Sequence, residues 1–336
     1  MNSPLLSWPG AIAAPDDALD AGVAWHFGDP FVEQRTGERT AIVVDRSNRD
    51  VIAVPGEDRL SWLHSLTSQH FLQLTEGQST ESLILDSNGR VERHFGVTHS
   101  QDTIWLDTEP GEGAALLAYL EKMRFWSKVE PAVADLGVLS VVGPQAPRVE
   151  GGIQRETSYG YDLLVPRSEL VDYWKKLLDA GAKPAGSWAF EALRVGALRP
   201  RLGVDTDERT IPHEMRWIPS AVHLDKGCYR GQETVARVHN LGKPPRKLVL
   251  LHLDGSSEIL PEPGEEITLD GRAVGRVGTA VRHHELGTVA LALVKRNTSV
   301  DAKLNIGDIA AAIDPDSEPE DTGPQAGRQA IERLRG

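Results

Sequence analysis

The pattern of apolar and polar residues divides the chain into three blocks, of which the first two mix strands and helices. Apolar runs bounded by turn residues are typical of strands, leucines that recur every third residue indicate one side of a helix, and Asn-Gly favours a tight turn. The first block is therefore predicted to contain strands at 40–45 and 51–54, a helix over 57–66, a hairpin turning at Asn88–Gly89, and a helix over 113–126.

The second block repeats this order of elements. Strands are predicted at 138–142 and 161–165. Ser168 and Ser187 are placed to cap the two helices that follow, because a serine oxygen accepts hydrogen bonds from the first N–H groups of a helix. Strands and helices in this order predict an α+β architecture, although the two blocks share no convincing sequence repeat.

The third block follows Pro244-Pro245 and contains strands alone. They are short and are joined by glycine, proline and aspartate, as in a small antiparallel barrel or sandwich. The predicted organisation is an irregular N-terminal segment at 1–38, α+β units at 39–130 and 131–243, a β-barrel at 244–313, and an acidic tail at 314–336 that we expect to be disordered.

Composition narrows the class of protein. The formal net charge of −13 argues against broad binding to nucleic acid or to an anionic membrane. One cysteine in 336 residues excludes an internal disulfide and a cysteine-only metal site. No secretory signal or membrane-spanning run is evident, so we expect a cytoplasmic protein. His283-His284 is the only adjacent histidine pair, has no third ligand nearby in the sequence, and predicts no metal site.

The single cysteine lies in the segment Lys226-Gly227-Cys228-Tyr229-Arg230-Gly231-Gln232-Glu233. A thiolate is favoured by nearby positive charge. If the segment is extended, Lys226, Cys228 and Arg230 share one face and Tyr229 lies on the other. Gln232 and Glu233 add an amide and a carboxylate. The residues alone leave two interpretations open, a reactive thiol and an inert buried cysteine.

This segment resembles the Lys-Gly-Cys-Tyr-x-Gly-Gln-Glu motif of the YgfZ family, folate-binding proteins related to the T-protein (aminomethyltransferase) of the glycine cleavage system. Similar segments occur elsewhere. They are Val54 to Thr67, Leu85 to Val91, Arg199 to Gly203, and Ile211 to Glu214. The resemblance covers roughly residues 40 to 310 and leaves both ends of the chain unexplained.

The resemblance implies the T-protein fold, in which two α+β units and a C-terminal barrel surround an opening that holds tetrahydrofolate. It implies a folate pocket that includes Arg49, Glu92, Trp188, Glu191 and Arg199. One feature departs from the T-protein, whose hairpin carries an acidic pair. Here that stretch reads Gly89-Arg90-Val91-Glu92-Arg93, so that Glu92 alone remains, and this loss weakens the case for aminomethyl transfer.

Two main functions remain open at this level, beside a weaker third option, a binding module that senses folate or docks on a modification enzyme. The resemblance implies a folate-binding accessory protein for the assembly or repair of iron–sulfur proteins, including enzymes that modify tRNA. Its partners would be those client or assembly proteins, with no direct contact to nucleic acid. The motif residues Lys226, Cys228, Tyr229, Arg230, Gln232 and Glu233 would do its chemistry. The alternative is a tetrahydrofolate-dependent one-carbon transfer enzyme, an aminomethyltransferase or a demethylase.

Overall fold

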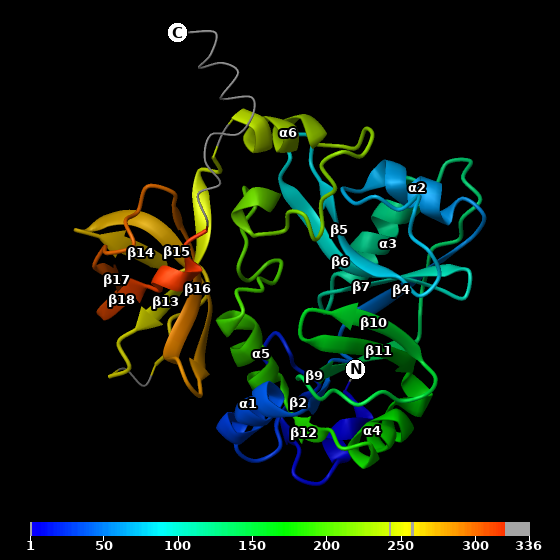
Figure 1. The fold of residues 1–336 in the computed structure, drawn as a ribbon, viewed down its shortest axis with the longest axis horizontal. Helices are drawn as coiled ribbons and strands as arrows, with labels where there is room; N and C mark the ends of the chain where they lie inside the picture. The colour runs from blue at the N-terminus through cyan, green and yellow to red at the C-terminus, as the bar shows by residue number, and fades with distance from the viewer. Residues whose placement is uncertain (1, 242, 257–258, 320–336) are drawn as a thin grey trace. The chain divides into compact units, whose positions relative to one another are not determined.

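The computed structural model describes residues 2–241, 243–256 and 259–319. The chain forms two compact units that alternate along the sequence (Figure 1). The first unit comprises residues up to 64, 71–81 and 95–193, and the second comprises 65–70, 82–94 and the residues from 194 onward. No helix among the described residues is long and apolar enough to cross a membrane.

One five-stranded sheet lies wholly in the first unit. Its strand order is β10-β11-β9-β3-β12, and β12 is parallel to β3 while the other pairs are antiparallel. The strands are β3 (Ile42–Asp45), β9 (Leu136–Val142), β10 (Ile153–Thr157), β11 (Gly160–Pro166) and β12 (Lys183–Ala185). The helix α4 (Leu170–Asp179) packs its Trp174 and Leu177 into the core of this sheet, and both side chains are fully buried.

A second sheet has the strand order β5-β6-β7-β4-β8. Its strands are β4 (Asp50–Pro55), β5 (Ser79–Leu85), β6 (Val91–Ser100), β7 (Thr103–Thr108) and β8 (Ala132–Val133). Two helices accompany it, α2 (Arg59–Leu66) and α3 (Gly113–Lys122). The sequence predicted both helices and the β5–β6 hairpin, but extended α3 to residue 126. The helix stops at Lys122, where Met123 N–H bonds back to Tyr119 and Leu120 carbonyls.

The N-terminal segment is less irregular than the sequence predicted. It contains a short 3-10 helix (Pro4–Ser7), the strands β1 (Ile12–Ala13) and β2 (Ala24–His26), and the helix α1 (Pro30–Arg39). Asp29 caps α1 by accepting from Phe31 N–H, and Pro30 fits the first helical position. The buried side of α1 carries Glu33 and Gln34 in place of an apolar stripe, which is why hydrophobic periodicity missed it.

Ion pairs buried in the first unit connect its two sheets. Arg155 of β10 bonds to Asp107 of β7 and to Asp162 of β11, and Arg49 bonds to Asp107 at 2.6 Å and to Glu109 at 2.9 Å. Burial alone raises the pKa of Asp162, but the neighbouring arginines, above all Arg155, outweigh burial and lower this pKa to about 2. Asp162 is therefore charged and depends on the arginines for compensation.

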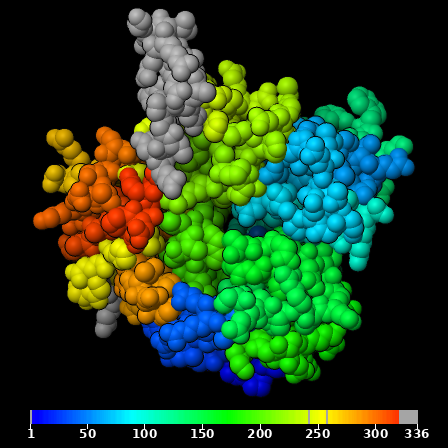
Figure 2. All heavy atoms as spheres, in the orientation of Figure 1, coloured from blue at the N-terminus to red at the C-terminus, as the bar shows by residue number. Residues whose placement is uncertain are grey.

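The second unit contains the predicted β-barrel, whose residues gather into one lobe in the space-filling view (Figure 2, yellow to red). The barrel is closed and antiparallel, in the order β13-β16-β15-β14-β17-β18. Its strands are β13 (Arg246–Leu253), β14 (Glu266–Leu269), β15 (Arg272–His283), β16 (Gly287–Lys295), β17 (Leu304–Ile306) and β18 (Ile309–Ile313). Its interior is aliphatic, with Val249, Leu251, Val277 and Val294 among the fully buried side chains.

Two further helices, α5 and α6, precede the barrel along the chain. The helix α5 (Ser187–Gly196) includes the expected cap Ser187 as its first residue, and the Ser187 hydroxyl donates to the Ala24 carbonyl. The helix α6 (Gln232–Leu241) begins within the cysteine segment. Short 3-10 turns occupy Arg167–Glu169, Pro212–Glu214 and Pro315–Ser317. The last of these shows that the expected disordered tail starts with ordered residues, because Asp314 caps the turn by accepting from Asp316 N–H. Residues 320–336 of that tail lie outside the described residues.

Replacing Arg155 by Met tests the weight of the buried ion pairs. The variant leaves Asp107 and Asp162 buried with less positive charge, so we expect the free energy of unfolding in urea to fall by about 3–5 kcal/mol. Arg148→Met is the matched control, because Arg148 pairs with Glu156 in solvent, where 48% and 69% of the two side chains are exposed. Its loss is expected to stay below about 1 kcal/mol. Equal losses of unfolding free energy in the two variants would contradict a stabilising role for the buried Arg155 ion pairs.

Candidate functional site

The cysteine segment forms a loop followed by a helix, so the extended conformation considered for it does not occur. Residues 226–230 have no regular structure, and α6 begins at Gln232, within the motif. Gly231 adopts a left-handed φ of +84°, and a Cβ there would lie 2.6 Å from the Asp86 carbonyl oxygen. A Cβ on Gly89, in the β5–β6 turn, would lie 2.8 Å from Thr234 of α6. Glycine at both positions therefore lets the hairpin and the loop touch backbone to backbone.

Lys226 anchors the start of the loop. Its side chain is buried, with 8% of the residue exposed, and its ammonium donates to the carbonyl oxygens of Thr67 and Gln69, the latter at 3.1 Å. The ammonium also lies 4.9 Å from the centre of the Tyr229 ring. Burial lowers the pKa of Lys226 to about 8, although carbonyl acceptors and an aromatic face favour its charged form.

Tyr229 and Gln232 hold the other side of the loop. Tyr229 N–H donates to Gln232 Oε1 at 3.2 Å, so the Gln232 side chain links the loop to the first turn of α6. The Tyr229 side chain is half-buried, and burial raises the pKa of its hydroxyl to about 12. This tyrosine is therefore neutral at physiological pH and acts as a packing surface for the Lys226 ammonium.

Arg230 and Glu233 lie on the exposed side. Arg230 Nη1 bonds to Glu92 Oε2 at 3.1 Å, across from the hairpin strand β6, and each side chain is close to half exposed. Glu233 is exposed in the first turn of α6, where a carboxylate favours the positive end of the helix dipole. The acid that remains from the hairpin pattern, Glu92, is thus paired with a motif residue.

Cys228 is exposed between these anchored neighbours. The row of Lys226, Cys228 and Arg230 that an extended segment would give does not form, because Lys226 turns inward to two carbonyls and Arg230 pairs with Glu92. The two cations thus flank the thiol in sequence but are each held by another group. Exposure on a braced loop favours the interpretation that Cys228 is accessible for chemistry over that of an inert buried cysteine.

The loop rests on a segment that sequence reasoning did not single out as part of the site. Thr67 to Gln69 supply the two carbonyls that hold Lys226, and the Gln69 side chain donates to the Ser220 carbonyl at 2.8 Å. Ser68 Oγ donates to the Ala221 carbonyl at 2.7 Å. Every residue has a backbone carbonyl, so residue identity cannot reveal which carbonyls bind Lys226. The similarity of the 54–67 segment was the one signal for this support.

The expected folate residues are divided between the two units. In the first unit, Trp188 and Glu191 lie three apart on α5 and therefore on one side of that helix. The Trp188 ring is 5.5 Å from the Trp25 ring, and Glu191 is buried. Arg49, in the same unit, is bound to Asp107 and Glu109 as described above.

The other two expected folate residues, Glu92 and Arg199, belong to the second unit. Glu92 pairs with Arg230. Arg199 is half-buried, and its backbone N–H and carbonyl bond to Arg194 at 2.9 and 3.0 Å, which fixes the chain just after α5.

The depressed pKa of Lys226 predicts how stability depends on pH. Between about pH 8 and 10.5 the unfolded chain keeps a proton that folded Lys226 has lost, so wild-type stability rises with pH relative to Lys226→Met. The relative gain should approach about 3 kcal/mol over that window. Urea unfolding at pH 7.5, 9 and 10 measures it.

Lys295→Met is the matched control for this measurement. Lys295 is an exposed lysine of the same unit, and its ammonium donates to the Ala273 carbonyl. Its variant should follow the wild-type pH profile. If the stability of wild type and of Lys226→Met changed with pH in parallel, the lowered pKa of a buried Lys226 ammonium would be contradicted.

The sequence of this chain is similar to one family model and to several known proteins. Residues 246–319 match the model of the CAF17 C-terminal beta-barrel domain. A putative chloroplastic transferase of Arabidopsis thaliana is 27% identical over 274 residues, which cover 70% of this chain and 61% of that protein. The chain thus spans under two thirds of that relative. An aminomethyltransferase of Nostoc sp. is 25% identical over 305 residues, 78% of this chain and 79% of that protein.

Among solved structures, aminomethyltransferase T of the glycine cleavage system from Bartonella henselae has a TM-score of 0.77 with this chain. The match covers 92% of this chain and 94% of that one at 20% sequence identity. It confirms the predicted α+β aminomethyltransferase fold with its C-terminal β-barrel. The barrel match and the relatives support a resemblance to the YgfZ/CAF17 proteins, and the shared fold is that of the aminomethyltransferases.

Proposed function

We propose that this chain is a folate-binding accessory protein for the assembly or repair of iron–sulfur proteins, tRNA-modifying enzymes among them, and that the Cys228 loop is its working part. The observation that carries the proposal is an exposed thiol on a loop whose neighbours on both sides are anchored. Lys226 fixes one side through two carbonyls, and the Tyr229–Gln232 bond fixes the other. Such a loop loses little conformational entropy when the thiol meets a partner.

One thiolate supplies one ligand. Iron–sulfur clusters are held by four protein ligands, most often thiolates. Cys228 is the only cysteine of the chain, so a client or assembly protein must supply the other ligands. The loop therefore fits a transient role, in which the sulfur binds iron or the edge of a cluster that the partner still holds. The cluster is cargo in this proposal, and the protein is expected to act in the cytoplasm.

The donor set of α5 fits tetrahydrofolate in part. Trp188 offers a half-buried aromatic ring, which suits the flat pterin, and Glu191 offers a buried carboxylate, which suits the N–H groups along the pterin edge. Arg49 does not fit the role of a ligand for the folate glutamate, because Asp107 and Glu109 already occupy its guanidinium. When bound, tetrahydrofolate supplies one-carbon chemistry at its ring nitrogens.

One-carbon transfer is the second candidate, since several relatives are named aminomethyltransferases. Within this chain, the candidate rested on Glu92, the one acid left of the acidic pair in the T-protein hairpin. The Glu92–Arg230 ion pair at 3.1 Å speaks against this role, because the carboxylate is already engaged by a residue of the motif. Formation of methylene-tetrahydrofolate from a methylamine donor by the purified chain would favour this candidate over the accessory role.

Cys228→Ser tests the accessory role. In a strain that lacks the gene, we expect this variant to leave iron–sulfur enzyme activity at the level of the deletion, because a serine hydroxyl does not ionise at neutral pH. Arg237→Ala is the matched control, since Arg237 is exposed on the adjacent helix α6. It should restore activity fully. Full rescue by Cys228→Ser would remove the thiol from the function.

Glu191→Gln tests the folate proposal separately. Loss of a charge-assisted hydrogen bond should raise the Kd of tetrahydrofolate, followed by tryptophan fluorescence, by about tenfold or more. Glu57→Gln is the control in the same unit, because the Glu57 side chain is 77% exposed and pairs with the similarly exposed Lys128. An unsaturable wild-type titration, or equal Kd values for all three proteins, would argue against a pterin site on α5.

A further inference from the structure

Two aromatic side chains of the first unit stand in solvent directly after α3. Phe125 is 73% exposed and Trp126 is 96% exposed, and their ring centres are 6.4 Å apart. They are the most exposed aromatic residues among the described large hydrophobics, whereas Trp62, in the neighbouring helix α2, is buried. Neither ring is used by the Cys228 loop or by the expected folate residues. Exposed tryptophan next to arginine is typical of the energetic centre of a protein interface.

The backbone that carries these rings is fixed. Trp62 Nε1 donates to the Met123 carbonyl at 2.9 Å, Ser127 N–H donates to the Arg124 carbonyl at 2.9 Å, and Lys128 N–H donates to Asp58 Oδ2 at 2.8 Å. Phe125 is held with a left-handed φ of +44°, a conformation that residues with a side chain seldom adopt. The surrounding contacts therefore impose this conformation, and the two rings are presented by a preorganised loop.

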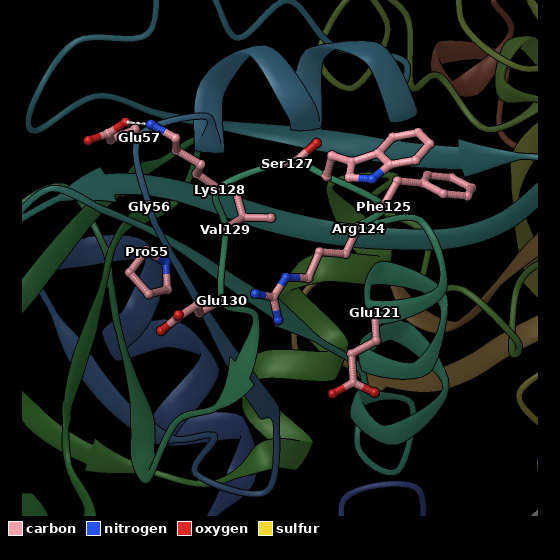
Figure 3. A pocket seen from close by; sticks show the side chains of 11 residues that line it. Pro55, Gly56, Glu57, Glu121, Arg124, Phe125, Ser127, Lys128, Val129 and Glu130 are labelled. Atoms are coloured by element: carbon pink, nitrogen blue, oxygen red, sulfur yellow. Dashed lines mark hydrogen bonds and ion pairs between the residues drawn. The ribbon is translucent and has the colours of Figure 1, made fainter.

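A cleft of about 750 Å³ adjoins the two rings (Figure 3). Its walls come from the end of β4, the end of α3 and the segment that follows α3. The lining residues are Pro55, Gly56, Glu57, Glu121, Arg124, Phe125, Trp126, Ser127, Lys128, Val129 and Glu130. A projection and a hollow therefore lie side by side on one surface.

The cleft is lined by charged side chains of both signs. Glu57 and Lys128 pair with each other at 2.7 Å at one end of the cleft. Figure 3 shows the Arg124 side chain extending into the cleft toward Glu130. Within the described ranges, Arg124, Glu121 and Glu130 form no ion pair through their side chains. One cation and two carboxylates thus remain available to a molecule that covers the cleft.

We propose that this surface is a self-association interface, in which a second copy of the chain docks about a two-fold axis. Such an axis brings the same patch of both copies together, so a projection beside a hollow complements itself. The Phe125 and Trp126 rings of each copy then enter the cleft of the other. Arg124 of each copy faces Glu121 or Glu130 of the second copy.

The size of the patch suits a reversible dimer. Each buried aromatic side chain removes about 150–250 Å² from water, so the four rings of two copies supply roughly half of the 1,200–2,000 Å² that a specific interface buries. The cleft walls supply the remainder. Three carboxylates and two cations line the cleft, which keeps this patch near neutral in a chain of net charge −13. Two copies therefore meet here with less repulsion than elsewhere.

Sedimentation equilibrium of the full chain at physiological salt tests the proposal directly. We expect a concentration-dependent monomer–dimer equilibrium, and Trp126→Ala should raise its dissociation constant by about 30-fold or more, the effect of an interface hot spot. Ile259→Ala is the control, because Ile259 is 78% exposed but lies far along the chain in the second unit. It should leave the constant unchanged.

Charge reversal gives a second, sharper readout. Arg124→Glu alone and the double variant Glu121→Lys, Glu130→Lys alone should each dimerise at least tenfold more weakly, because like charges then face each other. An equimolar mixture of the two should regain association as a heterodimer, since every facing pair is again opposite in sign. This recovery does not depend on the stability of any single variant.

Three outcomes would overturn the proposal. They are a wild-type chain that stays monomeric at every concentration, a dimer that Trp126→Ala leaves intact, and a variant mixture that shows no recovery. A monomeric wild type whose Trp126→Ala variant fails to support iron–sulfur enzymes in cells would assign the patch to a different protein. The proposal is independent of the function of Cys228, so either can fail alone.

Discussion

The bond between a buried lysine ammonium and two backbone carbonyls is the interaction on which the candidate site depends. The Lys226 ammonium is buried and donates to the carbonyls of Thr67 and Gln69. These two acceptors and the Tyr229 ring offset the free-energy cost of its desolvation. An uncompensated buried ammonium would be far more costly. The two neighbours of the thiol are therefore held in place, while Cys228 itself stays in solvent. The Gly231 and Gly89 contacts set how close the hairpin can come to this loop.

The sequence predicted the architecture better than it predicted the site. Apolar runs identified β3, β4, β9, β11 and the β5–β6 hairpin, and glycine- and proline-rich connections identified the barrel, because burial imposes those patterns directly. The strands β7, β10 and β12 were not predicted. The helix α1 escaped notice because its buried face carries Glu33 and Gln34, whose partners come from elsewhere in the fold. The helix α6 escaped notice because it starts inside the cysteine motif, whose spacing also suits a strand.

The motif residues lie together in one loop and the first turn of α6, but the partner of each side chain could not be predicted. Like-sign neighbours in sequence suggested a cationic row beside the thiol. The structure instead pairs Arg230 with Glu92 and turns Lys226 inward, and both partners come from distant segments. Arg49 likewise proved to be part of the buried ion pairs between the two sheets. Pairings between distant segments cannot be read from one sequence, because residue identity gives charge but not the neighbour that compensates it.

An accessible thiol is the central requirement of the account, and a chain with one cysteine allows a clean measurement of it. The rate at which native protein reacts with a neutral-pH thiol reagent can be compared with the rate in urea, where the chain is unfolded. The account predicts one reactive thiol per chain, and a native rate close to the unfolded rate, because Cys228 is exposed. A native thiol that reacts only as fast as the protein unfolds would show that Cys228 is buried and would contradict the proposed role of its loop.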